Sequence, residues 1–330
     1  MSKQWQVELW QECGHGQRCT FCYLKDDNLY TPDELKLDTL NKTIAALDVL
    51  RLTKEYDTVS YIGGEFFQGQ LANPKVHDKF MELMQKTAQL AKDGIIRSVW
   101  LAATMTVGDQ RDLWEALEYF KDIPRVDNHG MWVITSWDIK GRFNRPGSKE
   151  TWENTVARIH EKYPNFQLNT TIILTGALID AYLNGDFRFR DFCTKYGTSV
   201  FMKQPSPAIN GNEQGTDFMK AKAEFQKKVP FMFVTRDVFL KFLALMHQEE
   251  PELYEKLFNI QFRADTLMRN YNDADRHMVL NTRLKNNKLE FDPNTIPVSP
   301  NKCGHPMDYT PYLDNNECCL CDKHMIEEEF

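Results

Sequence analysis

Short runs rich in β-branched and aromatic residues alternate with longer helical patterns along the first two hundred residues of the chain. Successive short runs begin roughly 30 to 55 residues apart, which leaves room for a strand, a helix and two connections. Strict alternation predicts a parallel sheet, because each strand returns through a helix to pair with its neighbour. The predicted strands are 5–10, 58–62, 98–103, 131–136, 166–174 and 199–203.

Three helices are marked by their starts and by apolar stripes at three-and-four spacing. The run 31–34 (TPDE) is typical of a capping box with proline at the first helical position. Asn73 with Pro74 begins a second helix, and Ser148 precedes a third. The predicted core-facing stripes are Leu37, Leu40, Ile44 and Leu47, then Val76, Phe80, Leu83 and Leu90, then Trp152, Val156 and Ile159.

Two architectures satisfy this order of elements, a doubly wound sheet and a closed or partial barrel, and both place the active site at the carboxyl ends of the strands. The chain has 330 residues, which suits one α/β barrel with an appendage. We therefore expect a barrel core over 1–205.

The character of the chain changes after the sixth predicted strand. The polar, turn-rich segment 204–217 is typical of a lid or substrate loop, and helical patterns around 218–228 and 235–247 lead into a mixed, mainly helical stretch that ends near Met278. Residues 206–290 are therefore predicted to form a lid and helical extension. Residues 291–330 hold an extended connector and a cysteine-rich tail.

The charge and cysteine content restrict the function classes. Acidic residues outnumber basic ones by 47 to 40, a net charge of −7, which argues against bulk polyanion binding. No run approaches the roughly 18 apolar residues of a membrane span, and the first residues lack the apolar region of a secretory signal, so we expect a cytoplasmic protein with no membrane partner. Eight cysteines in a reducing compartment indicate metal or redox chemistry, because seven fall in two clusters.

Cys13, Cys19 and Cys22 form the first cluster, with C-x5-C-x2-C spacing directly after the first predicted strand. Three thiolates in one loop suit a metal. A zinc knuckle would require a fourth ligand, such as His15 or a distant residue. A four-iron cluster requires only three cysteines if one iron is left open for a ligand.

Gly63, Gly64 and Glu65 end the second predicted strand, in TVSYIGGEFF. Glycines suit a close approach of the backbone to a ligand, and a carboxylate suits a nearby ammonium. Together with the preceding cysteine loop, this segment resembles the radical S-adenosylmethionine (radical SAM) superfamily. The resemblance implies a [4Fe-4S] cluster on the three cysteines and contacts from Gly63 to Glu65 to the methionine amine of S-adenosylmethionine.

A third segment, at the fourth predicted strand, looks like the Ser-x-Asp strand end of the same superfamily. By that resemblance Ser136 contacts the ribose or carboxylate of the cofactor, Arg142 or Arg145 pairs with the carboxylate, and Asn169 is a further ribose-side residue. The likeness covers about residues 5–205 and implies a partial (β/α)6 TIM-like barrel. The sequence departs from the commonest C-x3-C-x2-C motif of the superfamily by two extra residues.

The resemblance also implies the chemistry. One electron, from a donor such as a flavodoxin or ferredoxin, would cleave S-adenosylmethionine at the reduced cluster and yield a 5′-deoxyadenosyl radical that abstracts hydrogen from the substrate. A nucleotide, nucleic acid or peptide substrate each fits the sequence. The competing class is a non-catalytic zinc-binding adaptor in which both cysteine clusters are structural.

The tail offers a second metal site, and Cys193 stands apart from both clusters. A structural zinc site would use Cys303, Cys318 and Cys321 with His305 or His324. An auxiliary iron-sulfur cluster is the alternative, because Cys319 supplies another thiolate. Cys193 lies among phenylalanines and is predicted to be a buried apolar residue.

Overall fold

The computed structural model describes residues 3–10, 12–13, 19, 30–127, 129–143, 145–196, 199–203, 227, 230–234, 236–254, 276–279, 283–285, 288–290 and 312–313. The predicted lid loop 204–217, the connector 291–302 and all of the cysteines and histidines proposed for the tail lie outside these residues. Cys22 and most of the predicted helix around 218–228 also lie outside them.

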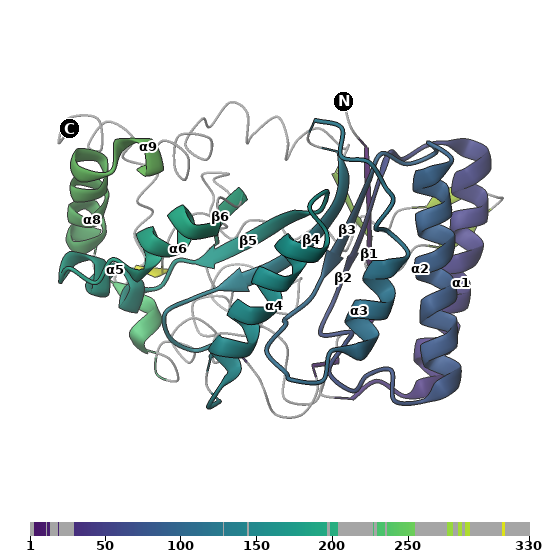
Figure 1. The fold of residues 1–330 in the computed structure, drawn as a ribbon, viewed down its shortest axis with the longest axis horizontal. Coiled ribbons are helices and arrows are strands. Elements are labelled where there is room, and N and C mark those ends of the chain that lie inside the picture. Colours follow the sequence, from purple (N-terminus) through teal and green to yellow (C-terminus); the bar gives the residue numbers. More distant parts are fainter. Residues whose placement is uncertain are drawn as a thin grey trace.

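A parallel sheet forms the centre of the fold (Figure 1). The strand order is β6-β5-β4-β3-β2-β1-β8, and every neighbouring pair is parallel. The strands are β1 (Gln4–Glu8), β2 (Thr58–Ile62), β3 (Ser98–Ala102), β4 (Gly130–Trp137), β5 (Gln167–Ile173), β6 (Ser199–Lys203) and β8 (Arg276–Val279). The six strands predicted from the sequence are confirmed, with ends that differ by at most two residues.

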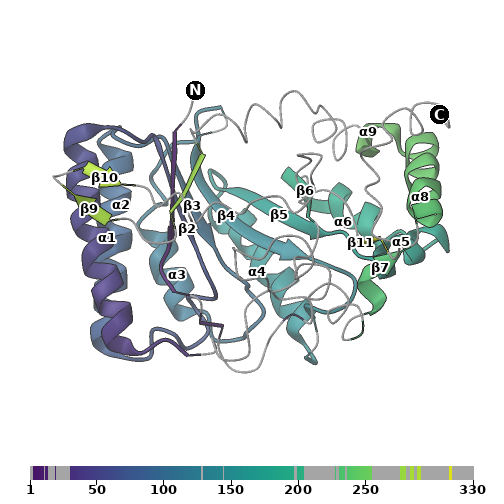
Figure 2. The same ribbon diagram turned by 180° about the vertical axis from the view of Figure 1, so that it is seen from behind.

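Helices connect the strands and cover one face of the sheet. Figures 1 and 2 show α3 and α4 on the same face, with α1 and α2 beside the β1 to β3 end. The elements α5, α6, α8 and α9 lie at the β6 end of the sheet, with α8 farthest from the strands (Figures 1 and 2). The helices are α1 (Asp33–Thr53), α2 (Pro74–Lys92), α3 (Arg111–Glu118), α4 (Ser148–Lys162), α5 (Gly176–Leu183), α6 (Arg188–Tyr196), α8 (Arg236–Glu249) and α9 (Pro251–Tyr254).

Short elements complete the described part of the chain. The 3-10 helix η2 (Pro230–Met232) leads into β7 (Phe233–Val234), which pairs in parallel with β11 (Tyr312–Leu313). Strands β9 (Arg283–Lys285) and β10 (Lys288–Glu290) form an antiparallel pair. The expectation of a mainly helical stretch up to Met278 is wrong at its end, because β8 joins the sheet beside β1.

The starts of two helices test the capping predictions. Asn73 caps α2 as predicted, with its Oδ1 accepting the N–H of Lys75 at 3.0 Å and Pro74 as the first helical residue. The capping box predicted for α1 is wrong. Pro32, which has no side-chain acceptor, occupies the N-cap, so Thr31 lies one residue too early to cap the helix and no side chain caps it. The N–H of Thr31 donates to the distant Glu12 carboxylate.

The two faces of the sheet differ in chemistry. One row across five strands is Val7, Tyr61, Leu101, Val133 and Leu168, and all five side chains are buried. The neighbouring row, on the opposite face, is Gln6, Ser60, Trp100, Trp132 and Gln167. A doubly wound sheet has helices on both faces and is apolar on both. No helix of the described residues covers this polar face (Figure 1), an arrangement compatible with the interior of a partial barrel.

None of the helices in the described part of the chain is long and apolar enough to cross a membrane. The predicted apolar stripes are confirmed, since Leu40, Phe80 and Trp152 have no exposed surface. Cys193 is buried beside Phe192, as predicted for an apolar position.

Because the two faces of the sheet differ, two alanine substitutions in β4 should destabilise the protein by different amounts. Met131 is fully buried on the apolar face, and Ile134 is partly exposed on the polar face. Met131→Ala should lower the free energy of unfolding by about 2–5 kcal/mol, and Ile134→Ala by clearly less. Urea unfolding measures both. Equal losses would contradict the assignment of the two faces.

Candidate functional site

The cysteine loop begins beside the Gly63 to Glu65 segment. Beyond the end of β1 the chain runs along the end of β2, where the N–H of Leu9 donates to Ile62 O at 3.2 Å. The N–H of Gly64 then donates to Trp10 O at 2.8 Å, and that of Glu65 to Glu12 O at 2.7 Å. Two segments about 50 residues apart in sequence, each predicted to belong to the site, therefore lie side by side at the carboxyl edge of the sheet.

Gly63 is required by this close approach. Its φ is +146°, and a Cβ at this position would overlap the carbonyl oxygen of Trp10. The contact between two backbone segments is thus sufficient to explain a glycine here, without any ligand.

The Glu65 carboxylate holds two loops together. Its Oε1 accepts the N–H groups of Phe66 and Phe67 at 2.9 and 2.8 Å, and its Oε2 accepts the N–H of Thr104, after β3, at 2.7 Å. The side chain is only 1% exposed. A carboxylate has about four acceptor positions, so the three backbone donors leave room for about one more partner such as an ammonium.

Arg142 connects the other predicted site residues. Its Nη1 donates to Ser136 Oγ at 2.5 Å and lies 3.9 Å from Cys19 Sγ, and its Nη2 donates to Thr104 O at 2.9 Å. The residue is 7% exposed, and its Nε has no hydrogen-bond partner within the described part of the structure. One guanidinium therefore joins the cysteine loop, the end of β4 and the loop after β3.

The Asp138 side chain accepts a hydrogen bond from the backbone of Arg142. Its Oδ1 and Oδ2 accept the Arg142 N–H at 3.1 and 3.3 Å. Burial raises the pKa of the Asp138 carboxyl to about 6, although the neighbouring Arg142 charge and backbone N–H groups oppose the shift. The end of β4 thus holds a buried acid that can change its charge near neutral pH.

The remaining predicted site residues are Asn169, Arg145 and the cysteines, of which Cys19 lies beside Arg142. Asn169 in β5 is buried, and its Oδ1 lacks a partner among the described residues. It pairs with Ile134, so it lies on the polar face of the sheet. Arg145 is exposed before α4, where its carbonyl accepts the N–H and hydroxyl of Ser148. Cys13 and Cys19 are partly exposed.

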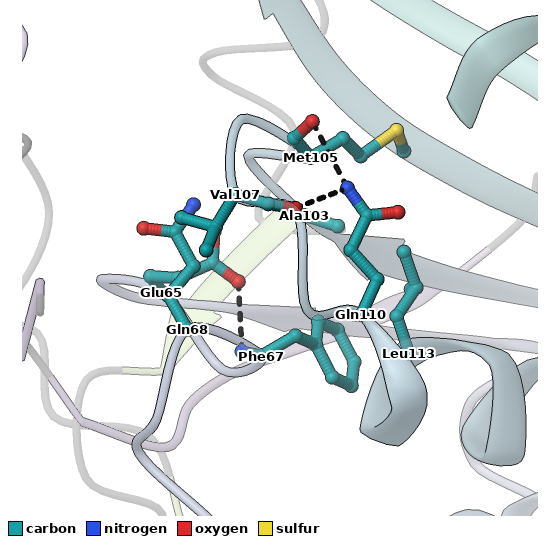
Figure 3. Close-up of a pocket in the computed structure, with 8 residues that line it drawn as sticks. All are labelled: Glu65, Phe67, Gln68, Ala103, Met105, Val107, Gln110 and Leu113. Carbon is teal, nitrogen blue, oxygen red and sulfur yellow. Dashed lines mark hydrogen bonds between the residues drawn. The ribbon is translucent and has the colours of Figure 1, made fainter. Parts of the chain in front are cut away.

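A small cavity adjoins the site (Figure 3). It measures about 10 Å³, which is room for about one water molecule, and Gln68 and Gln110 contribute amides to its wall. Gln110 Nε2 donates to the carbonyls of Met105 and Val107 at 3.2 and 2.8 Å, which supports the positive φ of Met105. Gln68 Nε2 donates to Thr104 and Thr106, so this loop is held from two sides.

Sequence reasoning did not find Thr104, Asp138, Glu12 or Lys36. Thr104 and Asp138 contact predicted site residues, Glu12 directly precedes Cys13, and Lys36 contacts Glu12. Asp138 had a signal in the Ser-x-Asp pattern, and the other three had none. Among the residues that the structure describes, no group of three or more His, Cys, Asp or Glu side chains is arranged to hold a metal ion. That set does not include Cys22.

No protein-family model and no curated protein matches this chain at a significant level. The residues and their geometry therefore carry the functional argument.

The close approach of two backbone segments at Gly63 predicts that one added methyl group lowers the stability of the protein strongly. Gly63→Ala should lower the free energy of unfolding by about 3 kcal/mol, because the backbone segments must separate and the alanine is strained at positive φ. Gly108→Ala is the matched control, since its Cβ would meet nothing within 4 Å. Chemical unfolding of both variants provides the test, which fails if Gly63→Ala is as stable as the control.

The buried Asp138 predicts a pH-dependent stability. A carboxyl whose pKa is higher in the folded state than in the unfolded state binds its proton more tightly when folded, so its contribution is present at low pH and is lost as the pH rises from about 4 to 6. In the metal-free protein, the stability of the wild type relative to Asp138→Asn should fall by about 3 kcal/mol between pH 4 and pH 7. Urea unfolding at several pH values measures this difference, and a pH-independent difference would contradict a buried, raised pKa.

Proposed function

We propose that this protein is a radical SAM enzyme with a partial (β/α)6 barrel core. The observation that carries the proposal is the convergence at Arg142, whose guanidinium contacts Cys19, Ser136 and the loop after β3. The cysteine loop starts beside Gly64 and Glu65. Three segments chosen from the sequence for one cofactor thus meet at the edge of the sheet where α/β proteins bind ligands.

The described residues fit the implied cofactors. Thiol side chains suit an iron-sulfur cluster, and Cys13 and Cys19 lie in the loop that would supply them together with Cys22. A buried guanidinium whose Nε has no hydrogen-bond partner among the described residues suits a carboxylate. The fourth acceptor position of Glu65 suits an ammonium. An amino acid carries both of these groups, as does the methionine end of S-adenosylmethionine.

A [4Fe-4S] cluster with S-adenosylmethionine supplies, after one-electron reduction by a donor such as a flavodoxin or ferredoxin, a 5′-deoxyadenosyl radical that abstracts hydrogen from a substrate. The residues of this chain would bind and orient the cofactors and shield the reacting groups from water. Arg142 and Ser136 orient a carboxylate or ribose, and Glu65 fixes the loops around them. The cytoplasm is the compartment this proposal requires, because it keeps the thiols reduced.

The polar face of the sheet is proposed to line the substrate space. Trp100 and Trp132 lie on it with ring centroids 5.4 Å apart, and the buried Asn169 oxygen lacks a partner among the described residues. Apolar rings and amides together suit an organic substrate with hydrogen-bonding groups. A nucleotide, a nucleic acid segment and a peptide all meet that description.

The test is anaerobic reconstitution with iron and sulfide. The wild type should bind about four irons at the cysteine loop and release 5′-deoxyadenosine from S-adenosylmethionine after reduction. Changing Cys13, Cys19 and Cys22 together to alanine should abolish both, because these thiolates hold the cluster. Cys193→Ala is the matched control, since this buried cysteine lies outside the loop and its loss should leave the iron content unchanged.

Three outcomes identify the alternatives. A triple variant that keeps all of its iron would place the cluster elsewhere. A wild type that binds only zinc and neither binds nor cleaves S-adenosylmethionine would favour the zinc adaptor. Metal that remains in the triple variant belongs to the tail, and its identity distinguishes a zinc site from an auxiliary cluster.

A further inference from the structure

A buried ion pair stands at the start of the cysteine loop. Glu12 directly precedes Cys13, and its Oε2 lies 2.7 Å from Nζ of Lys36 in α1. Lys36 is 2% exposed and Glu12 8%. Lysine is almost never this deeply buried on a surface helix unless its charge is paired.

The surroundings of Lys36 satisfy its ammonium group. Besides Glu12, its Nζ donates to Gln70 O at 3.1 Å and lies 3.8 Å from Asp33 Oδ1. It also lies 5.7 Å from the centre of the Trp10 ring, in a cation-π arrangement. The buried Lys36 ammonium thereby connects three parts of the chain, namely helix α1, the segment after β1 and the loop after β2.

Glu12 is a junction for three parts of the chain. Its Oε2 also accepts the N–H of Thr31 at 3.1 Å, and its carbonyl accepts the N–H of Glu65 at 2.7 Å. The chain therefore leaves this junction at Cys13 and returns to it at Thr31. The 18 residues from Cys13 to Tyr30 lie in sequence between Glu12 and Thr31, and the Thr31 N–H···Glu12 hydrogen bond joins these two flanking residues.

We infer that Glu12 and Lys36 are positioning residues for the cysteine loop. The pair closes the base of the loop and holds Cys13 at a fixed distance from Gly64 and Glu65. Loop closure lowers the entropy lost when distant thiolates are brought to one metal group. The inference rests on the proposed function for the identity of that group, but the closure itself is a property of the metal-free chain.

Stability alone is a poor explanation of this pair. Replacing a buried ion pair by apolar side chains is often neutral or stabilising, whereas removing one partner leaves an unpaired buried charge. A variant that lacks both charges therefore distinguishes a role in stability from a role in positioning the cysteine loop. The double variant Glu12→Gln/Lys36→Met should regain most of the stability lost in Lys36→Met, but the loop should stay open because Lys36 no longer ties Glu12 to Gln70.

The first measurement is hydrogen exchange in the metal-free, full-length protein. The Thr31 and Glu65 amides, which donate to Glu12, should exchange about tenfold faster in Lys36→Met and in the double variant. Lys42→Met is the matched control, because it removes a lysine of the same helix whose partner Asp38 is exposed. The control should exchange at the wild-type rate.

The second measurement follows reconstitution with iron and sulfide. Iron should be lost to a chelator several-fold faster from Lys36→Met, from Glu12→Gln and from the double variant than from the wild type. A purely electrostatic role predicts something else, namely shifts of the reduction potential in opposite directions for Lys36→Met and Glu12→Gln. A positioning role predicts the same direction of iron loss for both.

The outcomes separate this inference from the proposed function. If Thr31 exchange and iron retention return to wild-type values in the double variant, the pair contributes stability only and the inference is overturned. Wild-type exchange in Lys36→Met also overturns it. If the wild type binds no iron, the proposed function fails, and the exchange rates alone decide whether the pair closes the loop.

Discussion

One buried carboxylate organises the carboxyl edge of the sheet. Glu65 accepts three backbone N–H groups from two loops, and its own backbone bonds to Glu12 and to the Trp10 ring nitrogen. Hydrogen bonds to an ionised acceptor are stronger than neutral ones, and low dielectric strengthens them further. The position of Thr104 depends on this carboxylate, and the position of Arg142 depends in turn on the Thr104 carbonyl. The site is therefore assembled outward from Glu65.

The difference between the two sheet faces decides what the fold is suited for. Apolar rows such as Val7 to Leu168 supply the core beneath the helices, while the row from Gln6 to Gln167 combines amides and a hydroxyl with two tryptophans. Parallel sheets are usually covered on both faces and apolar on both. Local departures of this kind from the most stable arrangement are expected where a surface serves binding. The chemistry of this face is therefore compatible with a barrel interior.

Periodicity predicted the six strands and the helices between them because each pattern is local. The capping box of α1 was predicted wrongly because Pro32 occupies the N-cap, and the N–H of Thr31 donates to Glu12, a contact that no local pattern reveals. The strand β8 was missed because its pairing with β1 joins residues about 270 positions apart in the sequence. The spacing of Lys36 and Asp33 on one helix resembles an ordinary solvated pair, and only the fold buries it. Motifs thus indicated the candidate site, while long-range contacts set the geometry of its residues.

An arginine at position 142 can both hold neighbouring loops and bind a ligand, which a lysine could not do as well. A guanidinium has five N–H donors in a planar fork, so it can hold neighbouring loops and still receive a ligand. In this structure Nη1 and Nη2 are engaged by Ser136, Cys19 and Thr104, and Nε has no partner among the described residues. A buried unpaired donor costs about 1–3 kcal/mol until an acceptor arrives. A carboxylate ligand would remove that cost without disturbing the contacts that keep the site together.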